Sequence, residues 1–364
     1  MPFDDFMAAA LYAPGLGYYS GGRRIFGFGP ENGSDFVTAP ELSPFFGRAL
    51  AVQVREALTA ADSDQVFEFG AGSGALAEQL LEALDADDAD DDGMMRVAVD
   101  YVIVELSAPL RERQQRRLAR FAPRVRWLDA WPQRLDGAVI GNEVLDAMPV
   151  KLLRREAGRW RERGIVDLGA AAGAGARRFA FADLDAPFEL EGETQAAQAL
   201  SGEGFADGTV TEIHPIAESF VATLAERLRR GVVLLIDYGF PEHEYYHPQR
   251  IGGTLMCHRA HLADTDPLAD VGEKDITAHV NFSGVALAAQ EAGLEVLGYT
   301  SQARFLINCG MVDLLAAASV AERANAQKLL NEHEMGELFK VIALARGCTI
   351  DPIGFRAGDR SHRL

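Results

Sequence analysis

The sequence contains little cysteine. Only Cys257, Cys309 and Cys348 occur in 364 residues, and no two of them form a CxxC pair. This spacing argues against a disulfide framework and a structural zinc site, and it favours a reducing compartment. His258 and His261 lie close together like metal ligands, but no cysteine or carboxylate completes a familiar motif, so we expect no metal.

Basic residues are also scarce relative to acidic ones. Lysine and arginine number 35 against 54 aspartates and glutamates, which gives a formal net charge of −19. Such a charge repels a phosphate backbone and an anionic membrane surface, so nucleic acid is not an expected partner. The sequence shows no apolar run of about 18 residues and no basic leader in "MPFDDF". We therefore predict a cytoplasmic protein without a membrane span, and its oligomeric state stays open.

Short apolar runs alternate with helical patterns between residues 66 and 140. The runs "QVFEFG", "VDYVIVEL", "RVRWLD" and "GAVIGNE" are separated by helical segments that begin near Ala75 and Ala108. This alternation predicts an α/β fold with a doubly wound, mostly parallel sheet. The pattern resumes with "TVTEIHP" and "GVVLLIDYG", so we expect the same sheet to continue across an insertion.

The insertion is marked by two paired strand-like runs, "VKLLRRE" and "RWRERGIVDL", and by a polar stretch of weak periodicity after them. These boundaries predict four parts. They are an N-terminal arm and helix at residues 1–60 that close over a ligand, an α/β domain at residues 61–149 and 209–347, an inserted hairpin and cover segment at residues 150–208, and a C-terminal tail at residues 348–364.

The strongest local signal is "EFGAGSGA", residues 68–75, which ends an apolar strand and opens a helix. Gly70, Gly72 and Gly74 permit positive φ and a close approach of the backbone to a ligand, while the helix N-terminus offers free N–H groups. The stretch therefore predicts a nucleotide-like ligand. It also satisfies the dinucleotide pattern GxGxxG/A, so a nicotinamide-dependent oxidoreductase is one alternative.

Acidic residues stand at three successive strand ends. Glu68 lies where a carboxylate can bind the ammonium group of a methionine moiety. Glu105 is placed to accept both hydroxyls of a ribose, and Asp129 to accept an adenine amino group. The carboxyl ends of parallel strands meet at one edge of the sheet, where ligands bind in open α/β folds. Together the three acids and the glycines resemble a class I S-adenosylmethionine-dependent methyltransferase.

The next predicted strand ends in "VIGNEVLDAMPV", residues 139–150. At this strand end a methyltransferase places the residues that face the transferred methyl group, here Asn142 and Glu143. A negatively charged Glu143 favours a cationic nucleophile over a flat neutral base. The alternative is a carboxylate that is stabilised by a helix N-terminus.

Further segments carry a more specific resemblance, and they include "ALYAPGLGYYS", "SDFVTAPELSPFFG", "GNEVLDAMPV", "LLIDYGF", "GTLMCHRAHLADTDPL", "DITAHVNF" and "SQARFLINCG". Through them the chain, from about Phe6 to Gly347, resembles the MidA-like methyltransferases, which include the mitochondrial complex I assembly-factor arginine methyltransferase and bacterial relatives. The resemblance implies a seven-stranded class I methyltransferase sheet and S-adenosyl-L-methionine as donor. For the mitochondrial member it implies an arginine of a respiratory-complex subunit as acceptor.

The predicted donor site combines the acidic strand ends, the glycines and residues 36–41, a segment that we expect to close over the donor (the closing segment). Its predicted residues are Phe36, Thr38, Glu41, Glu68, Gly70, Gly72, Gly74, Glu105, Leu106, Asp129 and Asn142.

The predicted acceptor is the arginine of a protein substrate. Glu143 is the first carboxylate expected to hold the guanidinium, and the second is either Glu212 in "VTEIHP" or Asp275 in "DITAHV". His279, four residues after Asp275, is a candidate to hold a carboxylate or to accept the proton after transfer, with a structural role as the alternative.

Two questions stay open at the level of sequence. Tyr18 or Tyr19 in "ALYAPGLGYYSGG" either lines the acceptor channel, where a ring can stack on a guanidinium, or anchors the arm by packing. The protein as a whole is either an enzyme or an assembly chaperone that binds S-adenosylmethionine without turnover.

Overall fold

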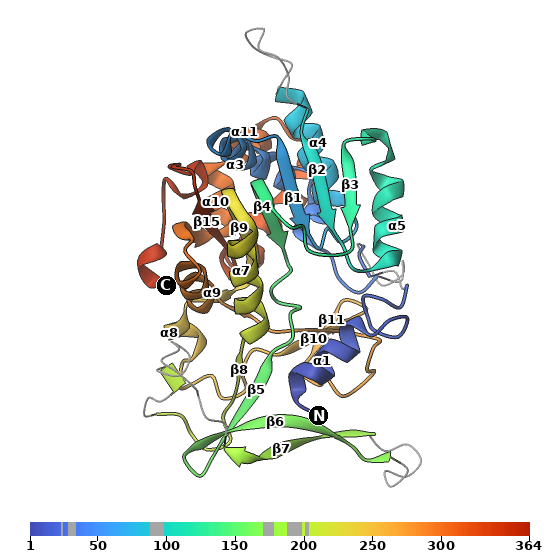
Figure 1. Cartoon of the computed structure of the whole chain (residues 1–364), viewed down its shortest axis with the longest axis vertical. Helices are drawn as coiled ribbons and strands as arrows, with labels where there is room; N and C mark the ends of the chain where they lie inside the picture. Colours follow the sequence, from blue (N-terminus) through green and yellow to red (C-terminus); the bar gives the residue numbers. More distant parts are fainter. Residues whose placement is uncertain (23–24, 28–33, 88–97, 170–177, 188–198, 201–203) are drawn as a thin grey trace.

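The computed structural model describes residues 1–22, 25–27, 34–87, 98–169, 178–187, 199–200 and 204–364. Its main feature is a central sheet flanked by helices (Figure 1). The strand order is β14 (Glu295–Ser301), β15 (Phe339–Arg346), β9 (Leu228–Phe240), β4 (Leu135–Asn142), β1 (Gln65–Phe69), β2 (Asp100–Val104) and β3 (Val125–Leu128). The strands from β9 to β3 are parallel, whereas β15 is antiparallel to both of its neighbours. The short β13 (Val280–Asn281) pairs with β9 as an eighth strand, which the expected count of seven misses.

The two faces of the central sheet enter separate hydrophobic cores. Val66 and Phe67, adjacent on β1, belong to different cores, as the alternation of side chains along a strand requires. One core includes helices α3 (Phe45–Ala61) and α4 (Ala75–Asp87), and the other includes α7 (Pro215–Arg227) and α9 (Phe282–Glu291). The predicted α/β fold with a mostly parallel sheet is confirmed.

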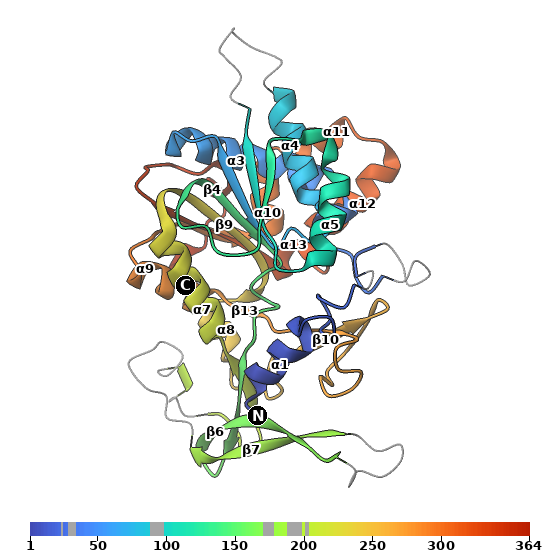
Figure 2. The same cartoon turned by 45° about the vertical axis from the view of Figure 1, so that its right-hand side comes forward.

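Two antiparallel sheets extend from this core. The four-stranded sheet has the order β7 (Phe179–Pro187), β6 (Arg159–Asp167), β5 (Lys151–Glu156) and β8 (Val210–Ile213), and the three-stranded sheet has the order β11 (Leu262–Asp264), β10 (Met256–Arg259) and β12 (Asp275–Thr277). Figures 1 and 2 both show β6 and β7 at the end of the molecule opposite α4. The predicted hairpin is present as β5 and β6. The expectation that "TVTEIHP" continues the central sheet is wrong, because β8 pairs with β5 instead.

The N-terminal helix α1 (Phe3–Tyr12) packs against β5, β6 and β12, and the one-turn helix α2 (Ala39–Leu42) follows it before α3. The other described helices are α5 (Ala108–Arg117), α8 (Glu242–Tyr245), α10 (Gln302–Asn308), α11 (Met311–Ala316), α12 (Val320–Leu330) and α13 (Met335–Leu338), with 3-10 turns at Ala119–Phe121, Ile353–Phe355 and Ser361–Arg363.

The C-terminal tail is held on α3, where Gln53 and Glu56 accept its backbone N–H groups. Among the described helices, none is long and apolar enough to cross a membrane.

Candidate active site

A cavity of about 1000 Å³ lies at the carboxyl ends of the parallel strands. It is lined by the glycine loop, by the ends of β2, β4 and β9, by the N-terminal segment and by β10 and β12. The sequence-predicted residues that line it are Phe36, Thr38, Glu68, Gly70, Gly72, Glu105, Leu106, Asn142, Glu143, Asp275 and His279. Glu41, Gly74, Asp129 and Glu212 are not among its lining residues.

The glycine loop between β1 and α4 requires glycine for conformation and for space. Gly70, Gly72 and Gly74 have φ values of 63°, 53° and 81°, in the left-handed region that other residues rarely adopt. A Cβ on Gly72 would lie 3.2 Å from the ring of Phe26, which itself lines the cavity. Any side chain there therefore crowds the cavity wall, whereas Gly74 serves the turn into α4.

Gln114, fully buried on α5, ties this loop to the next strand end. Its Nε2 donates to the Gly72 carbonyl at 2.9 Å and to Glu105 Oε2 at 3.0 Å. Its Oε1 accepts a bond of 3.1 Å from Trp127 Nε1. One amide thus sets the spacing between the glycine loop and the Glu105 carboxylate, a role that the surrounding run "RERQQRR" does not reveal in the sequence.

Two of the three predicted acidic strand ends face the cavity. Glu68 accepts a bond of 2.8 Å from the Tyr101 hydroxyl, and burial raises the pKa of Glu68 to about 8. Glu105 accepts the backbone N–H of Ser107 at 2.9 Å, and burial raises its pKa as well. Asp129 is different: its side chain is 76% exposed and lies 3.7 Å from Arg111. The structure therefore does not bring the Asp129 side chain to the cavity, although the next two residues, Ala130 and Trp131, line it.

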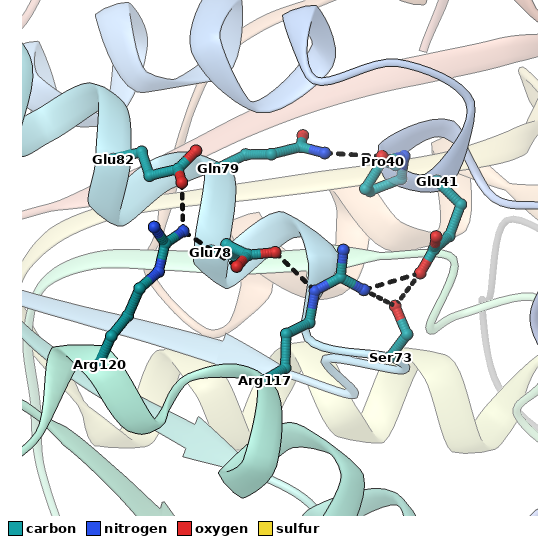
Figure 3. Close-up of polar contacts among 8 residues, drawn as sticks. All are labelled: Pro40, Glu41, Ser73, Glu78, Gln79, Glu82, Arg117 and Arg120. Atoms are coloured by element: carbon teal, nitrogen blue, oxygen red, sulfur yellow. Dashed lines mark hydrogen bonds and ion pairs between the residues drawn. The ribbon is translucent and has the colours of Figure 1, made fainter.

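The closing segment is fastened to the glycine loop from outside the cavity. Figure 3 shows Glu41 joined to Ser73 and to Arg117, whose Nη1 lies 3.0 Å from Glu41 Oε1. Gln79 Nε2 donates to the Pro40 carbonyl at 2.6 Å. Glu41 is thus a latch between α2 and the loop, not the lining residue that was predicted, since its carboxylate is taken by these two donors.

Three further carboxylates line the cavity: Glu143, Asp146 and Asp275. Burial raises the pKa of Glu143 and that of Asp275 to about 8, and the neighbouring Asp146 raises both further. Burial also raises the pKa of Asp146. Within the described part of the chain, none of the three has an ion-pair partner. These three carboxylates can therefore bind a cation that enters the cavity.

Tyr18 and Tyr19 have different roles in the structure, one from each of the two alternatives left open above. Tyr19 lines the cavity, donates to Asp275 Oδ1 at 3.0 Å and stacks on Tyr12 with ring centroids 5.6 Å apart. Tyr18 is fully buried, is not a lining residue and donates to Asp35 at 2.8 Å. The first ring of the pair is thus an anchor, and the second is a cavity wall.

His279 lines the cavity and packs against the rings of Tyr238 and Phe240. Burial lowers the pKa of His279 to about 4, and its ring stacks on Phe240 at an interplanar angle of 4°. Its buried Nδ1 has no hydrogen-bond partner among the described residues. The Tyr238 ring packs edge-on against it, and the Tyr238 hydroxyl donates to Asp146 Oδ2 at 2.6 Å.

Glu212 is not part of this group. It is fully buried on β8, where Oε1 accepts the N–H groups of Thr254 and Leu255 at 2.9 and 3.2 Å, and Oε2 accepts the Tyr245 hydroxyl at 2.9 Å. Since these bonds occupy both oxygens away from the cavity, its prediction as the second carboxylate is wrong. Asp275, the other candidate, is the one that lines the cavity with Glu143.

Sequence reasoning missed several side chains that line or support the cavity, among them Tyr12, Gln114, Asp146 and Tyr238. Two of them had a usable signal. Asp146 follows Glu143 by three residues in the segment after β4, and Tyr238 lies next to an acid at the end of an apolar strand. Tyr12 lines the cavity from the end of α1, and Gln114 supports its wall from α5, so no rule about strand ends points to either residue.

Comparisons with known proteins agree with this geometry. A family model of S-adenosyl-L-methionine-dependent methyltransferases matches residues 48–300. A Drosophila melanogaster protein named as a mitochondrial protein arginine methyltransferase, NDUFAF7 homolog, is 27% identical, over 95% of this chain and 82% of its own. The Mus musculus protein of that name is 27% identical, over 93% and 80%. The crystal structure of a Burkholderia thailandensis protein bound to S-adenosyl-homocysteine is 49% identical and superposes with a TM-score of 0.90, over 100% of this chain and 92% of that chain.

Proposed function

This chain belongs to the family of S-adenosyl-L-methionine-dependent methyltransferases, and we propose that it transfers the methyl group to an arginine guanidinium of a protein substrate. Family membership confirms the predicted enzyme class and cofactor and excludes the nicotinamide alternative. The assignment of arginine as the acceptor rests mainly on one observation: Glu143, Asp146 and Asp275 line the cavity, and none of them has an ion-pair partner among the described residues.

The residues at one end of the cavity fit the cofactor. A Cβ at Gly72 would crowd the Phe26 ring at 3.2 Å, the Asn142 Oδ1 is buried without a described partner, and Glu68 and Glu105 present buried carboxylates. We infer that Glu68 holds the ammonium group, that Glu105 accepts the ribose hydroxyls, and that Phe36, Thr38 and Leu106 cover the donor. When bound, S-adenosylmethionine supplies a methyl group on a sulfonium, which is an electrophile.

The acceptor end fits a guanidinium. An arginine side chain is always charged and presents its donors in a planar fork, so two carboxylates can grip it bidentately and leave one nitrogen free to react. Glu143 and Asp275 occupy that role here. Their desolvation disfavours the ionised form until a cation is present, which raises the selectivity of the site for charged acceptors. Positioning of the nitrogen, not strong base catalysis, carries the rate.

His279 is the proposed proton acceptor after transfer. A histidine whose pKa is lowered to about 4 is neutral at pH 7, and its Nδ1 is the one buried ring nitrogen in the cavity wall that lacks a described partner. The relatives named as protein arginine methyltransferases support the choice of arginine over lysine. A respiratory-complex subunit is the first candidate substrate, through the resemblance to the MidA-like family.

Transfer of a labelled methyl group tests the proposal. Purified protein is given methyl-labelled donor and either of two peptide mixtures, with a fixed central arginine (the arginine library) or a fixed central lysine (the lysine library) and flanking positions that are random but contain neither arginine nor lysine. We expect label in the arginine library alone. Glu143→Gln should slow transfer about 1000-fold while S-adenosylhomocysteine binds within about threefold of wild type. Asp129→Asn, the same chemical change outside the cavity, should leave both unchanged.

Other results would favour other functions. Label in the lysine library alone would reject arginine as the acceptor. Binding of S-adenosylhomocysteine without transfer to any library or to cell-extract proteins would favour the assembly chaperone.

We also propose a cytoplasmic location. The scarcity of cysteine supports it, and Cys257, Cys309 and Cys348 are all free in the structure. The curated relatives above are named as mitochondrial proteins, so cell fractionation with an antibody to this chain is the direct test.

A further inference from the structure

Asp237, near the end of β9, holds the segment that follows β4. Its side chain is 1% exposed, and its Oδ2 accepts the backbone N–H groups of Val144, Leu145 and Asp146 at 3.2, 2.9 and 3.2 Å. Its Oδ1 accepts the N–H of Tyr238 at 2.9 Å. One carboxylate therefore gathers four backbone donors, three of them from a single turn on the neighbouring strand's extension.

This turn carries Glu143 in an unusual conformation. Glu143 has a φ of 54°, in the left-handed region that a residue with a Cβ adopts at a cost. Its own N–H donates to the Ile236 carbonyl at 2.9 Å, one residue before Asp237. Two groups of β9 thus fix the chain around Glu143. The Ile236 carbonyl accepts the N–H of Glu143 itself, and the Asp237 carboxylate accepts those of the next three residues.

Four backbone hydrogen bonds compensate for the burial of the Asp237 carboxylate. Asp237 is buried near Glu143 and Asp146, and burial together with these two acids raises its pKa. A third buried acid beside two others opposes folding unless it is well hydrogen-bonded. What Asp237 adds is the geometry of the turn, because one oxygen that accepts three successive N–H groups leaves the turn little freedom.

We propose that Asp237 is a positioning residue for methyl transfer, which sets the direction of Glu143 toward the acceptor. Asp237 is not among the residues that line the cavity, so it acts through Glu143 and not on the substrate. The inference rests on the proposed function of Glu143 as the carboxylate that holds the acceptor.

The test compares Asp237→Ala with Asp237→Asn on the arginine library at saturating donor. Asp237→Ala removes the carboxylate that accepts the three N–H groups of the turn. It should lower kcat about 100-fold, because a misplacement of Glu143 by about 1 Å can slow the reaction by that factor. S-adenosylhomocysteine should still bind within about threefold of wild type. Asp237→Asn keeps one oxygen for the three N–H groups and should recover most of the loss, whereas a lost charge alone would leave both variants equally slow. The Asn variant also keeps the inference testable if the Ala variant does not fold.

A double-variant cycle separates positioning from simple loss of structure. If Asp237 acts through Glu143, then Glu143→Gln with Asp237→Ala is about 1000-fold slower than wild type, like Glu143→Gln alone, and not slower by the product of the two effects. Asp359→Ala is the control, since Asp359 Oδ1 also accepts two backbone N–H groups, from Tyr299 and Ser361, but away from the cavity. It should lower the Tm and leave kcat unchanged.

Two results overturn the inference: a kcat of Asp237→Ala equal to that of wild type in folded protein, or full multiplication of the two effects in the cycle. Failure of the proposed function is seen separately, in wild type, as label outside the arginine library. The same cycle then runs on whichever acceptor wild type labels.

Discussion

The Tyr19 hydroxyl donates a bond of 3.0 Å to the Asp275 carboxylate, across a separation of 256 residues. Tyr19 comes from the turn after α1, and Asp275 opens β12. The bond therefore joins the N-terminal arm to the antiparallel sheet at the wall of the cavity, and it holds one of the carboxylates proposed to grip the acceptor.

Tyr19→Phe should weaken the acceptor side of the reaction and spare the donor side. A hydrogen bond to a charged group contributes about 2 kcal/mol, so we expect kcat/KM on the arginine library to fall at least about tenfold. S-adenosylhomocysteine affinity, measured by calorimetry, should stay as in wild type. The control is Tyr18→Phe, which loses a bond of 2.8 Å to Asp35 outside the cavity lining. Equal loss of activity in both variants would contradict a specific role of Tyr19.

Arg117→Ala should speed the dissociation of the donor. Arg117 binds both Glu41 on the closing segment and Glu78 on α4, at 3.0 and 2.7 Å (Figure 3). Because a partly exposed ion pair contributes about 1 kcal/mol, we expect about a fivefold higher dissociation rate of S-adenosylhomocysteine in stopped flow. Arg120→Ala is the matched control, since Arg120 contacts Glu78 and Glu82 but not Glu41. The latch is disproved if both variants release the ligand at the wild-type rate.

Gly72→Ala should weaken donor binding for a steric reason. The new Cβ would lie 3.2 Å from the ring of Phe26, so this ring, which lines the cavity, must shift by a few tenths of an ångström. Gly158→Ala provides the comparison, because Gly158 also has a positive φ, of 75°, but no atom within 4 Å of its Cβ position. Both variants should lose about 1 kcal/mol of stability through backbone strain, as measured by urea unfolding. Calorimetry should show weaker S-adenosylhomocysteine binding in Gly72→Ala alone.

Stability should fall as the pH rises through the range in which the cavity carboxylates ionise. Carboxyl groups in the unfolded chain lose their protons near pH ~4, whereas burial raises the pKa of Glu143 and that of Asp275 to about 8. Between these values the folded state binds more protons than the unfolded state, so the free energy of unfolding declines with rising pH and levels off above about 8.

The measurement is the Tm of ligand-free protein across this pH range. In the double variant Glu143→Gln/Asp275→Asn, the Tm should fall less steeply with rising pH, because the two groups that bind the extra protons are gone. A decline as steep as in wild type would show that other groups are responsible.

Much of the donor site could be predicted from the sequence because its rules are local. A glycine loop between a strand and a helix needs positive φ, and the ends of neighbouring parallel strands must meet at one edge of the sheet. Glu68, Gly72 and Glu105 follow from these two rules, and Glu143 follows from the position of the fourth strand. The alternation of apolar runs and helical patterns likewise determined the central α/β sheet.

The acceptor site was decided by the tertiary structure. Glu212 and Asp275 are equally acidic neighbours of strand-like runs, and the sequence offers no means to choose between them. The pairing of β8 with β5 buries Glu212 among backbone donors, whereas the pairing of β12 with β10 brings Asp275 to the cavity. In the same way, the Asp129 side chain is left in solvent although its neighbours Ala130 and Trp131 line the cavity. Such contacts depend on how separate sheets pack, and periodicity along one strand carries no record of that.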